Sequence, residues 1–259
     1  MEIGFVTSLE TGLDYAGVID YIEETVGSFL KPDEDENAFS ESLEAADTAA
    51  LPVPAVCCFV PGKIKSVGPE LDIDVLLEWA EKVFTRAHRA GTEIVVYGSG
   101  GSRKIPEGFP EDEARDQFIE VLQKMGPCAR ASDITVVLEP LNSGETNFIN
   151  SVSEGAAVVR EVSHSNIRLL ADIYHMAADN EPAQAILSCG ELIEHAHCAE
   201  RENRAAPGTA GFDFVPYLSA LKEAGYDKRI SVECSWNNIE EQAEQAVEYL
   251  KDQLKQAGY

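Results

Sequence analysis

Four residues of metal-binding types lie at or near the ends of four successive strand-like segments. They are Glu139 in TVVLEP, Asp172 in IRLLAD, His197 in LIEHAH and Glu233 in RISVEC. Intervals of 33, 25 and 36 residues separate them, about what a strand, a helix and two loops occupy in a parallel α/β fold. Three carboxylates and one imidazole suit an octahedral divalent cation better than a closed tetrahedral zinc site. The pattern indicates a metal-dependent enzyme.

Eight strand-like segments divide the chain, and the candidate ligands belong to the last four. The segments span residues 2–7, 19–26, 54–60, 93–98, 134–139, 167–172, 192–198 and 229–234. Apolar residues recur every three or four positions in 75–90, 114–131, 153–162 and 239–258, which predicts amphipathic helices, the second interrupted at Gly126 and Pro127. Alternating strands and helices predict an α/β fold. With eight such units we expect one domain over residues 1–259, a (β/α)8 TIM barrel.

Strand parity supports an inward position for the ligands, because residues two apart point to the same face of a strand. Glu139 shares its face with Val137, whereas Val136 faces the covering helices. Glu233 shares its face with the small, polar Ser231. A single acid at a strand end could instead cap the next helix or begin a loop. Four such residues at regular intervals favour a shared site.

Composition restricts the classes of partner. A formal net charge of −26 over 259 residues repels nucleic acid phosphates, and no basic stripe offsets it. No stretch approaches 18 uncharged apolar residues, and residues 1–10 lack a signal-peptide pattern. Six cysteines without a CxxC pair fit a reducing compartment. We therefore expect a cytoplasmic protein that binds neither nucleic acid nor membrane, with the acidic run at 31–37 as a solvated loop before a helix.

Five stretches together resemble a known family. They are GSGGSRKIPEGF (98–109), EPLNSGETNFIN (139–150), ADIYHM (171–176), HAHCAERENRAAPG (195–208) and ISVECSW (230–236). Any one alone is weak, but their joint order and spacing are specific. The chain resembles the xylose isomerase-like TIM barrels, and within them the ketose 3-epimerases (tagatose or psicose 3-epimerases) and hydroxypyruvate isomerase-like proteins.

The resemblance implies roles for seven residues. It implies metal binding by Glu139, Asp172, His197 and Glu233, proton transfer by Glu139 and Glu233, and substrate contacts by Glu145, His175 and Arg204. It also implies one divalent metal ion, with manganese favoured over magnesium, cobalt or zinc. The substrate would be a small sugar or hydroxy-carbonyl compound, and the assembly a homodimer or homotetramer.

Several activities share this residue set. Proton transfer on opposite faces of one carbon gives an epimerase, and transfer between adjacent carbons gives an aldose–ketose or hydroxypyruvate isomerase. A dehydratase acting on an inosose or dehydroshikimate begins with the same step, and a non-catalytic sugar-binding barrel is a further alternative. A zinc-cluster nuclease would need more than five histidines and basic loops.

Two further motifs have simpler interpretations. His195 shares its face with His197 but lies one layer deeper, so we expect an interior histidine with its hydrogen bonds satisfied rather than a fifth ligand. GSGGSR at 98–103 lacks the ending of a nucleotide-binding loop. We expect a loop on the catalytic face whose glycines permit close approach to substrate, with phosphate binding as the lesser alternative.

Overall fold

Eight parallel strands close into a barrel in the computed structural model, which describes residues 1–259. Each strand pairs with its sequence neighbour, and β1 pairs with β8. The strands are β1 (Glu2–Val6), β2 (Tyr21–Thr25), β3 (Ala55–Cys57), β4 (Ile94–Tyr97), β5 (Thr135–Leu138), β6 (Ile167–Asp172), β7 (Ile193–Cys198) and β8 (Arg229–Val232). All eight predicted strands are present, and the predicted (β/α)8 class is confirmed.

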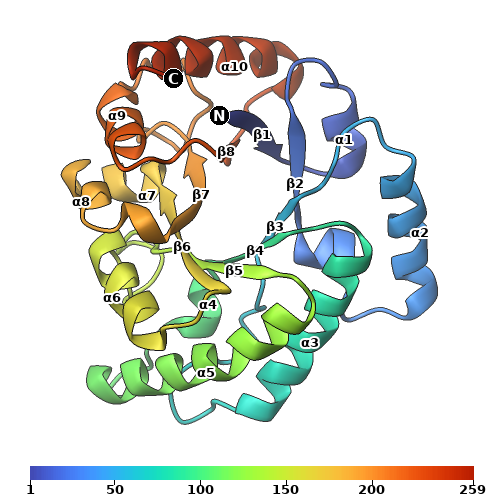
Figure 1. Cartoon of the computed structure of the whole chain (residues 1–259), viewed down its shortest axis with the longest axis vertical. Coiled ribbons are helices and arrows are strands. Elements are labelled where there is room, and N and C mark those ends of the chain that lie inside the picture. The colour runs from blue at the N-terminus through green and yellow to red at the C-terminus, as the bar shows by residue number, and fades with distance from the viewer.

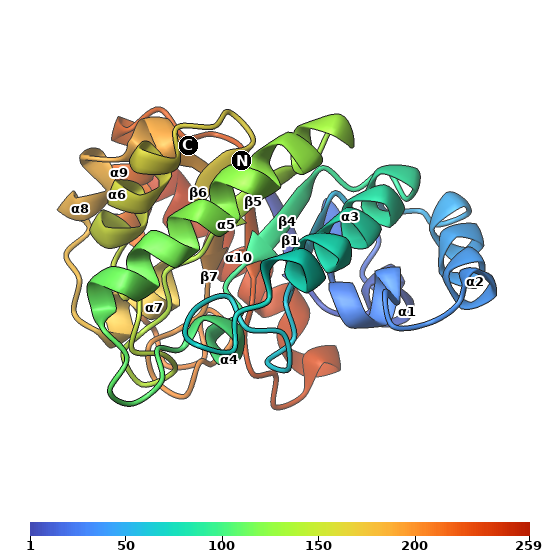
Figure 2. The same cartoon turned by 90° about the horizontal axis from the view of Figure 1, so that it is seen from below.

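Helices surround the barrel (Figure 1), and the view from below shows α3 and α5 lying side by side across one flank (Figure 2). They are α1 (Leu9–Leu13), η1 (Val26–Leu30), α2 (Glu36–Asp47), α3 (Ile73–Arg89), α4 (Gly100–Arg103), α5 (Glu111–Ala131), α6 (Val152–Val162), α7 (Ile173–Ala178), α8 (Gln184–Leu187), η2 (Gly190–Leu192), α9 (Val215–Glu223) and α10 (Ile239–Gln256). None of them combines the length and apolarity that a membrane crossing requires.

Two apolar layers hold the barrel together. A small cluster fills its interior, formed by Ala55, Cys57, Ile94, Val96, Val137 and Leu170. A cluster of 63 buried residues lies between the strands and the helices, and it includes Val136 and Leu138. The predicted parity of β5 is therefore confirmed, and it leaves Glu139 on the inward side of the strand's end.

Helix α5 runs without a break through Gly126 and Pro127, so the predicted interruption is wrong. The glycine serves packing rather than helix termination, since a Cβ at Gly126 would lie 2.6–2.9 Å from ring atoms of His164. Pro127 removes one backbone donor. Buried apolar residues before and after this point, Leu122 and Ala129 among them, keep the helix packed on the barrel.

The acidic run at 31–37 leads into a helix, as predicted, because α2 begins at Glu36. The Asp35 carboxylate accepts hydrogen bonds from the backbone N–H groups of Asn37 and Ala38, at 3.0 and 3.1 Å, and so caps α2. Phe39 anchors this outlying helix, because its ring is fully buried beneath the guanidinium groups of Arg86 and Arg89.

Candidate functional site

The four predicted ligands come together at the carboxyl ends of β5 to β8. Glu139 follows β5, Asp172 ends β6, His197 lies in β7, and Glu233 follows β8. One ligand atom from each lies within 4.8 Å of the others. The sheet register produces this convergence, since His197 pairs with Asp172 on one side and with Ser231, two residues before Glu233, on the other.

The imidazole of His197 lies between the two glutamates. Its Nδ1 atom is 3.4 Å from Oε1 of Glu139 and 3.1 Å from Oε2 of Glu233. The side chains of Asp172 and His197 are buried, whereas that of Glu233 is 22 % exposed. The cluster is therefore closed toward the barrel interior and open on the Glu233 side, where a substrate could enter.

Unpaired polar atoms indicate that this cluster suits a cation. Oε1 of Glu139 and Oδ2 of Asp172 are buried, and neither accepts a hydrogen bond. Buried carboxylate oxygens without a partner are costly in free energy. A divalent cation would compensate both, and three carboxylates with one imidazole are the donors that hard divalent ions accept. The residues present thus fit the predicted metal ion.

The pKa values of the two glutamates are shifted in opposite directions. Burial, together with the negative charge of Glu233, raises the pKa of Glu139 above its ordinary value. Burial also opposes ionisation of Glu233, but hydrogen bonding and charge from His197, with the charge of Arg204, lower its pKa. Paired carboxyl groups whose environments differ in this way are common where one group donates a proton and the other accepts it.

The glycine-rich segment supports Glu139 directly. A Cβ atom at Gly98 would lie 2.1 Å from Oε2 of Glu139, so only glycine leaves room for this carboxylate. From α4 in the same segment, the buried Arg103 donates a hydrogen bond of 2.7 Å to the backbone carbonyl of Glu139. Burial lowers the pKa of Arg103 to about 10. Gly98 therefore makes room for the carboxylate of Glu139, and the close approach of a substrate to these glycines stays a prediction.

His175 offers a hydrogen-bond donor to the site. The backbone N–H of Asn142 donates to Nδ1 of His175 at 3.2 Å, which places the ring hydrogen on Nε2. That Nε2 atom is buried without a partner, 3.4 Å from Oδ2 of Asp172 and 4.0 Å from Oε1 of Glu139. An N–H aimed into the cluster can bind a hydroxyl or carbonyl oxygen of a substrate.

Arg204 and Glu145 lie at the rim of the cluster. Arg204 donates from Nη2 to Oε2 of Glu233 at 2.6 Å, and its Nη1 lies 3.5 Å from Oε1 of Glu145. Its guanidinium also stacks on the ring of Tyr174, 4.7 Å from the centroid. All seven predicted site residues thus belong to one cluster of side chains, with Glu145, 40 % exposed, on the solvent side.

The loop that carries Arg204 is held by a buried carboxylate. Glu200 is fully buried, and it accepts hydrogen bonds from the backbone N–H groups of Gly208, Ala210, Gly211 and Phe212. Four donors on one carboxylate fix the two ends of this loop to each other. Sequence reasoning missed Glu200, because nothing in its local sequence identifies partners up to 12 residues away.

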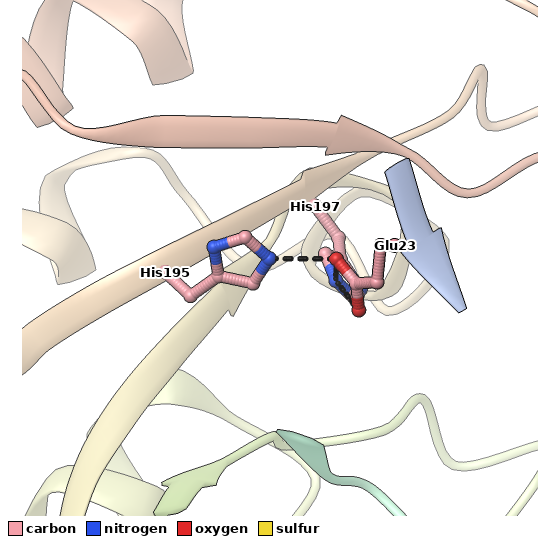
Figure 3. Close-up of side chains that lie close together, drawn as sticks. All are labelled: Glu23, His195 and His197. Carbon is pink, nitrogen blue, oxygen red and sulfur yellow. Dashed lines mark hydrogen bonds and ion pairs between the residues drawn. The ribbon is translucent and has the colours of Figure 1, made fainter. Parts of the chain in front are cut away.

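Sequence reasoning also missed Glu23, which lies inside the barrel beneath His197. Its carboxylate is 2.7 Å from Nε2 of His195 and 3.0 Å from Nε2 of His197 (Figure 3). The interior position of His195 is confirmed and its Nε2 is hydrogen-bonded, but its buried Nδ1 has no partner, so the expectation of fully satisfied hydrogen bonds is wrong for that atom. Parity offered a signal for Glu23, because one of the consecutive residues Glu23 and Glu24 in β2 must point into the barrel.

The sequence matches the family that the motifs indicated. A family model described as xylose isomerase-like TIM barrel matches residues 10–253. The L-ribulose 3-epimerase of Methylomonas sp. (strain DH-1) is 29 % identical over 187 residues, which cover 61 % of this chain and 65 % of that protein. The chain therefore matches just under two thirds of the length of this curated relative.

Solved structures share the fold. The D-psicose 3-epimerase of Clostridium cellulolyticum H10, crystallised with D-tagatose, has a TM-score of 0.84 at 18 % identity, over 98 % of this chain and 99 % of that one. The IolI protein, solved with a bound zinc atom, has a TM-score of 0.75 at 18 % identity, over 99 % of this chain and 98 % of that one. At such identities these likenesses show the fold alone, whereas the family model covers nearly the whole sequence. The chain belongs to the xylose isomerase-like TIM barrel family.

Proposed function

We propose that this chain is a divalent-metal-dependent isomerase of the ketose 3-epimerase type. The main support is that the side chains of Glu139, Asp172, His197 and Glu233 converge. Two of their buried carboxylate oxygens have no hydrogen-bond partner. The name of the L-ribulose 3-epimerase relative supports the reaction class. A divalent cation held by these four side chains would polarise the ketose carbonyl and make the proton on the neighbouring carbon more acidic.

In this proposal the two glutamates move the proton. Glu139 and Glu233 approach His197 Nδ1 from β5 and β8, strands that are not neighbours in the barrel. A substrate lying between them would present opposite faces of one carbon to the two carboxyl groups. One of these carboxyl groups would accept the proton on one face, and the other would return one on the opposite face. That sequence inverts the stereocentre.

The remaining residues would hold the substrate. The Nε2–H of His175 would donate to a substrate oxygen close to the metal. Glu145 and Arg204, which interact at the rim, would bind hydroxyl groups further out, one as acceptor and one as donor. Arg204 would also keep Glu233 oriented through the hydrogen bond between its Nη2 and Oε2 of that residue.

The proposal also covers the identity of the metal ion, the cellular compartment and the oligomeric state. Manganese suits the oxygen-rich donor set with one imidazole. The six cysteines form no disulfide, which fits a cytoplasmic protein. We also propose a homodimer or homotetramer, to be measured by light scattering. Elemental analysis of protein purified without added metal would identify the ion.

Proton NMR in deuterium oxide tests the reaction. Metal-loaded protein would be incubated with a panel of free ketoses, short hydroxy-carbonyl compounds and inososes. We expect deuterium at carbon 3 of a ketose, with formation of the C3 epimer. Exchange accompanied by conversion between carbons 1 and 2 would replace the epimerase with an isomerase, and loss of water would replace it with a dehydratase. No exchange with any substrate despite bound metal would overturn the proposal.

A further inference from the structure

A carboxylate from the far side of the barrel is buried against two histidines of β7. Glu23 of β2 and the side chains of His195 and His197 are all fully buried (Figure 3). Glu23 Oε2 lies 2.7 Å from His195 Nε2, and Glu23 Oε1 lies 3.0 Å from His197 Nε2. Ser231 of β8 completes the set, with its hydroxyl 2.5 Å from Glu23 Oε2. The reaction proposed above assigns no task to Glu23.

Counting hydrogens determines which atoms donate. An ionised carboxylate only accepts, so both histidines must carry a hydrogen on Nε2 and Ser231 must donate its hydroxyl hydrogen. The hydroxyl of Tyr21, 2.8 Å from Ser231 Oγ, then donates to that oxygen. His195 fits this count, because its Nδ1 has no hydrogen-bond partner and therefore needs no hydrogen. Every hydrogen in the cluster then has an acceptor.

The count has a consequence for the metal centre. In this structure His197 also shares a hydrogen bond with Oε2 of Glu233 through Nδ1, at 3.1 Å. With Nε2 committed to Glu23, a metal ion would replace the Nδ1 hydrogen and bind the atom that faces Glu139 and Glu233. A metal-binding histidine commonly donates its other ring N–H to a carboxylate, which fixes the ring and makes the ligand nitrogen more basic. Glu23 occupies that position here.

We propose that Glu23 is a positioning residue, which holds His197 with its hydrogen on Nε2 and so presents Nδ1 to the metal ion. This proposal rests on the metal centre of the proposed function, and it adds a residue from the opposite side of the barrel to that centre. His195 and Ser231 keep the Glu23 carboxylate in place through two further hydrogen bonds.

The same three side chains could in principle form a second metal site, because one ligand atom of each lies within 4.8 Å of the others. The hydrogen-bond count argues against that arrangement. All the polar atoms that a second ion would take from Glu23 and the two histidines are already paired with one another, at 2.7–3.1 Å. The metal stoichiometry distinguishes the two arrangements.

The variant Glu23→Gln tests the proposal at constant side-chain size. Its amide offers one oxygen and one NH2 group to two histidines, so it allows the hydrogen of His197 to move to Nδ1. We expect 10- to 100-fold weaker Mn2+ binding, the range typical when such a partner is removed. Affinity would be measured by chelator competition, with near-ultraviolet circular dichroism to confirm folding. Ser231→Ala is the graded comparison, since it removes one donor from Glu23 and leaves both histidine contacts. We expect it to weaken Mn2+ binding by a smaller factor than Glu23→Gln does.

Asp172→Asn separates this proposal from the metal centre itself. If Asp172→Asn weakens Mn2+ binding while folded Glu23→Gln binds like wild type, the positioning role is overturned and the metal centre stands. If wild-type protein binds no metal, both are overturned. Nitrogen-15 NMR of zinc-loaded wild-type protein provides a test without mutation. A hydrogen on Nε2 of His197 supports the proposal, whereas a hydrogen on Nδ1, or two zinc ions per chain, overturns it.

Discussion

Replacing Gly98 with alanine would test the position of Glu139 most directly. The added Cβ would lie 2.1 Å from Oε2 and 3.2 Å from Cδ of Glu139, and 3.4 Å from a methyl group of Leu141. Ordinary contact begins at about 3.4 Å, so the carboxylate must move by roughly 1 Å or more. The backbone at Gly98 has no positive φ, and alanine is therefore tolerated there apart from this collision.

The expected magnitude follows from the tolerance of metal sites. Ligand distances in such sites are held to within about 0.2 Å, and misplacing a reacting group by about 1 Å can cost roughly 100-fold in rate. We expect Gly98→Ala to bind Mn2+ at least about tenfold more weakly, because a protein ligand is displaced. Deuterium wash-in next to the ketose carbonyl should slow by about 100-fold, while the circular dichroism spectrum stays that of the wild type.

Gly101→Ala is the matched control in the same glycine-rich segment. A Cβ at Gly101 would come no closer than 3.6 Å to any neighbour, the nearest being Cα of Gly62, and the φ of Gly101 is also not positive. We expect metal binding and deuterium exchange in this variant to match wild type within a factor of about two. Wild-type metal affinity and exchange rate in folded Gly98→Ala would refute the reasoning, because Glu139 could then not be a ligand in the position described.

Three further results are expected. Glu233→Gln should abolish deuterium exchange without unfolding the chain, and full exchange in that variant would remove Glu233 from the mechanism. Chelation should stop exchange, and metal restored to about 100 times its Kd should raise the free energy of unfolding by about 2.7 kcal/mol in chemical denaturation, unless the ion also binds the unfolded chain. Gly4→Ala would place a Cβ 2.4–2.6 Å from the buried ring of Tyr21, which should destabilise the barrel by about 1–3 kcal/mol; Gly27→Ala, with nothing within 4 Å, should differ from wild type by less than about 0.5 kcal/mol.

The barrel could be predicted because its elements depend on local patterns. Strand parity correctly placed Val137 inside and Val136 outside. The error at Pro127 arose because a proline within a helix was judged by its local cost of about 3 kcal/mol. In α5, burial of apolar residues on both sides of the proline outweighs that cost.

The four candidate ligands could be located because parallel strands carry their carboxyl ends to one edge, whereas Glu145, His175 and Arg204 were implied by the family resemblance. Sequence order alone therefore brought Glu139, Asp172, His197 and Glu233 to one place. The sequence could not show which groups hold them there. Arg204, for example, lies on a loop whose backbone has positive φ at both Asn203 and Arg204, and its path depends on contacts outside its own motif.

The supporting residues escaped prediction for a common physical reason. Glu23 and His197 are 174 residues apart, and their contact exists only because the closed barrel brings β2 across from β7. Arg103 reaches Glu139 over 36 residues, through a backbone carbonyl that carries no signature in the sequence. A metal ligand is recognisable by its residue type and its place at a strand end. A positioning residue is recognisable only by the residue that it contacts. The three-dimensional arrangement of the strands in the closed barrel must therefore be known before such residues can be identified.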